Sequence, residues 1–141
     1  MRTQFSLLAI ALLCSFAIPS ARAADIKIIA NAGVNASTIS AEDLKGVFLA
    51  TKSSLSDGSR VEPVLEKAGA AHEAFVKAYL GKTDAALQTY YRSLVFSGKG
   101  SMPKELASDA EMVAYVAKTK GAIGYVSSGT STAGVKVLEI Q

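Results

Sequence analysis

The fold of this chain is decided by one short stretch, Gly121-Ala122-Ile123-Gly124-Tyr125-Val126. It lies where a helical pattern ends and an apolar run typical of a β-strand begins. Glycine at such a junction indicates that the backbone needs a positive φ angle, or that another part of the chain comes very close. The stretch therefore predicts a helix-to-strand junction followed by a strand.

Clear signals flank this junction on both sides. Ser108 is followed at its third position by Glu111, which is the spacing of a capping box and predicts a helix before the junction. The alternating run at 135–140 predicts the last strand. The hydroxyl-rich segment 127–132 between the two strands is interpreted as a solvated loop, and the alternative is a ligand loop beyond the carboxyl end of a strand.

The earlier part of the chain shows the same two spacings of apolar residues, one typical of helices and one typical of strands. They predict a strand at 26–31, a helix at 41–49 after the cap residue Ser40, a strand at 61–65, a helix at 70–80 closed by Gly81, and a helix from Thr83 to Val95. Pro63 lacks a backbone N–H, so its strand is expected at a sheet edge or at a strand end. Interleaved strands and helices indicate an α/β fold, with about four strands and helices on the faces of the sheet.

The first 23 residues have the composition of a secretory signal peptide rather than of a domain. A basic start at Met1-Arg2 precedes an apolar run at 5–18, and Ala21-Arg22-Ala23 places small residues where a signal peptidase cleaves. The run is shorter than the roughly 20 residues of a membrane-spanning helix. We therefore expect a signal peptide at 1–23, a periplasmic location, and no membrane span after cleavage.

Cleavage after Ala23 would change both the charge and the cysteine content of the chain. It would remove Arg2, Arg22 and the single cysteine, Cys14, and leave 13 basic against 12 acidic side chains. A net charge near +1 gives no electrostatic footprint for nucleic acid. The remaining chain has no cysteine, one histidine and no paired carboxylates at a spacing that would let them act together. It therefore shows no catalytic set, no metal site and no cofactor motif. It is predicted not to be an enzyme.

Three segments together resemble the phosphate-type substrate-binding proteins of ABC transporters, and within that group a short, single-lobe branch. They are residues 43–49, the Asp57-Gly58 turn with 61–64, and Gly98-Lys99-Gly100 with the 121–126 stretch. The resemblance covers nearly all of residues 24–141. It implies one periplasmic-binding-protein-like domain over 24–141, built as a single lobe of the type II fold with a small mixed sheet.

The loop expected to hold the ligand departs from this family. In two-lobe members, an Arg-x-Asp-x-Ser-Gly-Thr loop after a strand binds phosphate, and both lobes close over it. The corresponding segment here is 65–72, which has none of those arginine, aspartate, serine or threonine residues. Lys67 and His72 can donate hydrogen bonds, but not in the bidentate fork of an arginine, and Glu66 would repel an anion. The resemblance therefore implies the fold but not phosphate binding.

A second candidate ligand loop is the segment Ser97-Gly98-Lys99-Gly100-Ser101. Its glycines free the backbone, so consecutive N–H groups could form a nest for an anion, with Lys99 adding charge. The alternative is a flexible connection between two helices, closed by Pro103. His72 likewise either donates to an anion near a helix start or is an exposed helical residue without a role.

Two functional hypotheses follow from these observations. The first is a periplasmic solute-binding-like protein without the phosphate loop, which would bind a small anion and serve an ABC permease or a sensor protein. The alternative is a non-transport interaction or sensory accessory module, whose single-lobe face binds a partner protein or a second copy of the chain.

Overall fold

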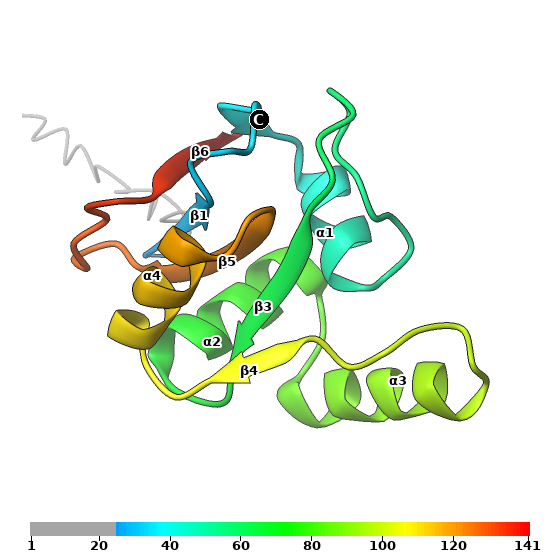
Figure 1. The fold of residues 1–141 in the computed structure, drawn as a ribbon. Helices are drawn as coiled ribbons and strands as arrows, with labels where there is room; N and C mark the ends of the chain where they lie inside the picture. The colour runs from blue at the N-terminus through cyan, green and yellow to red at the C-terminus, as the bar shows by residue number, and fades with distance from the viewer. Residues whose placement is uncertain (1–24) are drawn as a thin grey trace, which may run out of the picture.

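The computed structural model describes residues 25–141 (Figure 1), and the predicted signal peptide at 1–23 lies outside the described residues. The strands are β1 (Ile26–Ala30), β2 (Thr38–Ile39), β3 (Glu62–Glu66), β4 (Lys104–Leu106), β5 (Ala122–Ser127) and β6 (Lys136–Ile140). The helices are α1 (Ala41–Phe48), α2 (Ala70–Phe75) with its π-helical continuation η1 (Val76–Leu80), α3 (Asp84–Phe96) and α4 (Asp109–Lys118).

The strands form one mixed sheet in the order β2-β6-β1-β5-β3-β4. β5 lies inside the sheet, antiparallel to β1 and parallel to β3. The sheet has six strands rather than about four, because β2 and β4 were not predicted. Each is only two or three residues long and is defined by its pairing with β6 or β3, not by a local alternating pattern.

The expectation that β3 is an edge strand is wrong, since it lies between β5 and β4. The other half of that expectation, a strand end, is correct. Pro63 pairs with Ile123 of β5, whereas pairing with β4 begins only at Val64. Proline therefore lies where β3 has a single neighbour, the place in a sheet where a missing N–H is tolerated.

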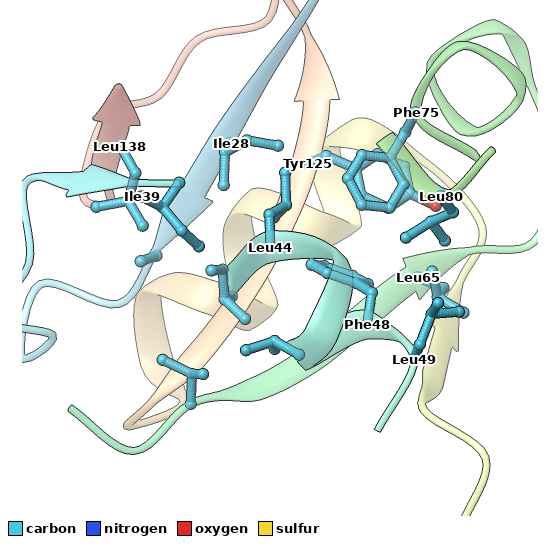
Figure 2. Close-up of a cluster of buried hydrophobic side chains, with 14 of the residues drawn as sticks. Ile28, Ile39, Leu44, Phe48, Leu49, Leu65, Phe75, Leu80, Tyr125 and Leu138 are labelled. Carbon is cyan, nitrogen blue, oxygen red and sulfur yellow. The ribbon is translucent and has the colours of Figure 1, made fainter. Parts of the chain in front are cut away.

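The two faces of the sheet carry separate apolar clusters, because successive side chains of a strand point to opposite faces. Ile123 and Tyr125 of β5 belong to the larger cluster, together with α1, α2 and η1. Figure 2 shows Leu44 and Phe48 of α1 pointing from their helix into this cluster. The smaller cluster lies on the other face, where α4 packs on the remaining β5 side chains.

The predicted helix starts are confirmed at three capping residues. The side-chain oxygens of Ser40, Thr83 and Ser108 each accept a hydrogen bond from the backbone N–H three residues later. Such caps satisfy N–H groups that have no partner within the helix. Within residues 25–141, no helix combines the length and the apolar character that crossing a bilayer requires.

Candidate functional site

The carboxyl ends of three neighbouring strands meet at one edge of the sheet. β4, β3 and β5 run parallel, so the segments that follow them lie together, and ligands of open α/β sheets bind beyond such ends. Glu66 ends β3, Asp109 begins α4 shortly after β4, and Thr130 lies in the loop after β5. These three side chains make up what we call the acid edge.

A carboxyl pair occupies the centre of the acid edge. The Glu66 side chain is buried (3% exposed), and its Oε1 atom has no hydrogen-bond donor among the described residues. Burial, a hydrogen bond to Asp109 and the charge of Asp109 together raise the pKa of Glu66 to about 8. Glu66 is therefore protonated at neutral pH and can donate its proton to Asp109.

Asp109 is the charged member of the pair. Burial would raise its pKa, but hydrogen bonds from Glu66, Thr130 and Ser127 outweigh burial and lower the pKa to about 2. The Ser127 N–H and the Thr130 hydroxyl donate to Asp109 Oδ2 at 3.0 and 2.6 Å. The segment 127–132 is thus not simply solvated, since its Ser127 N–H and Thr130 hydroxyl hold this carboxylate.

The acid edge offers nothing that resembles a phosphate clamp. Its one ionised group is a carboxylate, which repels anions, and the donors around Asp109 are already engaged. Lys67, which directly follows Glu66, is exposed and is the only Lys or Arg among residues 66–72. Its backbone N–H donates to the Leu106 carbonyl at 2.9 Å, which ties the loop to β4.

His72 is buried, which corrects the reading of it as an exposed helical residue. It is 2% exposed, and both ring nitrogens have partners within the protein. Nδ1 lies 2.5 Å from the Tyr125 hydroxyl, and Nε2 lies 2.8 Å from Asp84 Oδ1. The pattern of apolar residues along the helix did not reveal this burial, because the partners of His72 come from β5 and from the start of α3.

The hydrogen bonds around His72 run in one consistent direction. The Glu66 N–H donates to the Tyr125 hydroxyl oxygen at 2.9 Å, so the hydroxyl proton is free to point at His72 Nδ1. Nδ1 then accepts, and the protonated Nε2 donates to Asp84. Tyr125 is fully buried, so its hydroxyl cannot reach a solute, and the network serves to join α2, α3, β3 and β5.

The loop at 97–101 is a helix cap rather than an anion nest. The Gly98 and Lys99 N–H groups donate to the carbonyls of Val95 and Leu94 at 3.2 and 3.0 Å. Together with the positive φ angle of Gly98 (69°), these two bonds form a Schellman motif at the end of α3. Both N–H groups are thereby used, so they do not hold an anion.

The end of the same loop lines a groove of about 390 Å³, which we call the lysine groove. One wall is the segment after α1, with Lys52, and the other is the segment before β4, with Lys99. Lys104, the first residue of β4, also lines the groove, but its Nζ lies over the Tyr115 ring of α4, 5.3 Å from the centroid. Gly100 and Ser101 also line it, and Glu62 is its acidic side chain. Lys52 Nζ is paired with Asp43 Oδ1 at 2.6 Å.

The structure does not bring the predicted site residues to one place. Lys99, Gly100 and Ser101 line the lysine groove beside the start of β3, whereas Lys67 and His72 follow the end of β3. Lys52 and Lys104 were missed because nothing local in the sequence links them to the 97–101 loop. In the described part of the chain, no group of three His, Cys, Asp or Glu residues is placed to hold a metal ion.

Comparison with solved structures identifies the fold. An ABC-type phosphate transport receptor from Vibrio cholerae matches 82% of this chain with a TM-score of 0.62 and 16% identity. A phosphate ABC transporter substrate-binding protein from Clostridium perfringens, with bound phosphate, matches 82% with a TM-score of 0.64 and 13% identity. The PstS protein of Borrelia burgdorferi matches 83% with a TM-score of 0.63 and 11% identity.

These matches confirm the resemblance inferred from the sequence at the level of the fold. The aligned part of this chain spans 44 to 47% of the length of those three proteins, which is less than half of each. No protein-family model and no curated protein sequence matches the chain.

Proposed function

We propose, from a fold shared with phosphate-binding proteins of ABC transporters, that this chain is a solute-binding-like protein that does not bind phosphate at the acid edge. The fold supports a binding role rather than catalysis, since its structural neighbours are binding proteins. The signal-peptide pattern at 1–23 supports a periplasmic location, in which the partner would be a permease or a sensor protein.

One observation carries the proposal: the buried Glu66 and the half-buried Asp109 lie where the family resemblance implies a phosphate loop. Burial and the neighbouring Asp109 raise the pKa of Glu66 to about 8, and the donors that face Asp109 are already used. A phosphate dianion placed there would meet a carboxylate rather than an arginine fork. Lys52 and Lys99 line the lysine groove at the other end of β3, which makes it a candidate place for a solute anion.

Phosphate titration tests this proposal. A phosphate receptor with a Kd of about 1 µM would gain about 4 kcal/mol of stability in 1 mM phosphate. We expect no rise in the melting temperature with phosphate and no saturable heat in calorimetry. Sulfate and organic anions should be titrated in parallel, to find any anion that does bind.

The variants Lys67→Ala and Lys99→Ala serve as the matched pair in these titrations. Saturable phosphate binding that Lys67→Ala abolishes and Lys99→Ala leaves intact would overturn the proposal, because it would place phosphate at the acid edge. Binding of an anion that only Lys99→Ala weakens would instead support a solute site in the lysine groove.

A second candidate function is an interaction or sensory accessory module without transport. The observation that favours it is an exposed apolar cluster at the end of α3, where the Phe96 side chain is 95% exposed. Surfaces of this kind commonly contact another protein. Sedimentation of the purified chain tests whether the partner is a second copy, since the mass of a self-associating chain would rise with protein concentration. A chain that stays monomeric would indicate a partner of another kind.

A further inference from the structure

Asp109, the charged residue of the acid edge, has no cationic partner within the described part of the chain. The ion pairs of the described residues lie elsewhere, at Asp43 and at Asp84. Lys67, the one Lys or Arg among residues 66–72, is exposed and belongs to neither pair. Carboxylates that are withdrawn from water are normally paired with a cation or a metal ion. The acid edge therefore carries a negative charge that no described side chain neutralises.

Glu66 adds a hydrogen-bond acceptor that no donor satisfies. Its side chain is 3% exposed, and Oε1 has no hydrogen-bond partner among the described residues. A buried acceptor of this kind costs stability unless a donor reaches it. The Glu66 proton cannot serve, because it lies in the hydrogen bond to Asp109. The acid edge thus lacks both a positive charge and a hydrogen-bond donor.

The acid edge can be reached beside Asp109. The Ser127 N–H and the Thr130 hydroxyl both donate to Oδ2, so Oδ1 accepts nothing from the 127–132 segment. Asp109 and Thr130 are half-buried, and the neighbouring residues Ser108 and 128–129 are exposed. The Oε1 atom of the buried carboxyl group is closed to solvent, so a ligand that contacts it requires a small movement of the surrounding chain.

We propose that the acid edge binds the primary ammonium group of a small solute, which donates hydrogen bonds to Asp109 and to Glu66 Oε1. An ammonium group supplies one positive charge and three N–H donors, and therefore matches both of the missing features. Its charge equals that of the pair, in which only Asp109 is ionised. The inference deepens the first proposed function and rests on it, because it names the class of solute: an amine where the family resemblance implies phosphate.

Other ions fit the acid edge less well. A calcium ion takes roughly six to eight oxygen ligands. Within the part of the chain that the structure describes, no group of three His, Cys, Asp or Glu residues is placed to hold a metal ion. A quaternary ammonium ion has the charge but no N–H group, so it would leave Glu66 Oε1 unsatisfied. An anion would be repelled by Asp109.

Two amines and one control salt test the proposal. Putrescine represents a free amine, and a peptide with blocked ends and a single lysine among glycines represents the side chain of a partner protein. Tetramethylammonium chloride is the control, since it has the charge without N–H donors. Binding is followed by NMR shifts of the ¹⁵N-labelled chain. We expect putrescine to give saturable shifts at Glu66, Asp109 and 127–130, and tetramethylammonium to give none there.

Four variants identify the groups that hold the ammonium. Asp109→Asn should weaken putrescine binding at least about tenfold, because it removes the charged acceptor. Glu66→Gln should retain binding, since an amide has the same acceptor and donor as the neutral carboxyl group, whereas Glu66→Leu should weaken it. Asp57→Asn is the matched control, because this carboxylate also accepts an N–H and a hydroxyl, both of Ser59, but is exposed. The ¹⁵N spectrum of each variant shows whether it is folded.

Several outcomes would overturn the proposal. They are no binding of putrescine, the same shifts with tetramethylammonium, and an equal loss of binding in Asp57→Asn. Loss of binding in Glu66→Gln would overturn it too, because the ligand would then require an ionised Glu66, as a metal ion does. Binding of the peptide without binding of putrescine would place the ammonium group on a partner protein rather than on a solute.

Failure of this inference and failure of the first proposed function remain distinguishable. Saturable phosphate binding that depends on Lys67 would overturn the proposed function itself. Absence of both phosphate and amine binding would overturn only the ammonium site and would leave the proposed function standing.

Discussion

Two glycines of the helix-to-strand junction are required for different physical reasons. Gly121 has a φ angle of +79°, a conformation that side chains with a Cβ rarely adopt. Gly124 has no such angle, but a Cβ built there would lie 2.5 Å from Met112 Sδ of α4. The first glycine makes the turn, and the second lets α4 pack directly on the sheet.

We therefore expect Gly124→Val to destabilise the protein by about 1–3 kcal/mol, because it overpacks the contact with Met112. Urea unfolding measures the loss. Gly129→Val is the matched control, since Gly129 has open space around it and no positive φ angle. Met112→Ala should recover part of the loss in the double variant. A Gly124→Val protein as stable as the wild type would show that α4 does not pack this closely.

Among the elements, α3 is the least embedded helix. Only Leu87 and Tyr91 of its thirteen residues are buried, and Figure 1 shows the helix at the margin of the molecule, away from α4. Besides its apolar contacts, α3 is held by two tyrosine hydroxyls. The Tyr91 hydroxyl donates to the Phe48 carbonyl at 2.6 Å, and the Tyr90 hydroxyl donates to the Leu49 carbonyl at the same distance. Both bonds satisfy carbonyls at the end of α1.

Tyr91→Phe should cost about 1–3 kcal/mol, because it leaves the buried Phe48 carbonyl without that partner. We expect hydrogen exchange of the α3 amides to speed up more than exchange in β1 or β5, since α3 can open locally. Tyr90→Phe is the control, because its bond is only partly buried and water can replace the hydroxyl. Equal exchange rates in all elements would contradict a separately opening α3.

At the scale of the whole molecule, the acid pair makes stability depend on pH. Folding raises the pKa of Glu66 from 4.5 to about 8 through burial and Asp109. Its contribution is full below pH 4.5 and is lost as the pH rises to 8. The pKa of Asp109 falls from 3.8 to about 2, so its contribution is present above pH 3.8 and is lost as the pH falls to 2.

The free energy of unfolding should therefore be highest near pH 4 to 5 and fall toward pH 8, by at most about 1.4 kcal/mol per pH unit. Glu66→Gln should flatten this fall, because glutamine keeps a donor for Asp109 without taking up a proton. Glu73→Gln, an exposed change on α2, is the control. Urea unfolding across this pH range measures the slopes. An unchanged slope in Glu66→Gln would mean that the pair does not share a proton on folding.

Local features of the fold could be predicted because their causes lie within a few residues. Ser40, Thr83 and Ser108 cap helices through bonds to the third following N–H, and their side chains alone indicate where each helix begins. The buried strand at 121–126 was likewise evident from its composition. The short strands β2 and β4 could not be predicted, since they are strands only through their neighbours.

The sequence by itself determined an α/β fold, its helix starts, its glycine junction and the absence of arginine from residues 65–72, since each depends on residue type and short spacing. The tertiary structure alone decided which side chains meet at the end of β3. The bonds that join His72 and Glu66 to Tyr125 span 53 and 59 residues, and Asp109 lies near Glu66 because β3 and β4 run parallel. Burial then determines which carboxyl group keeps its proton, and burial is a property of the packed molecule.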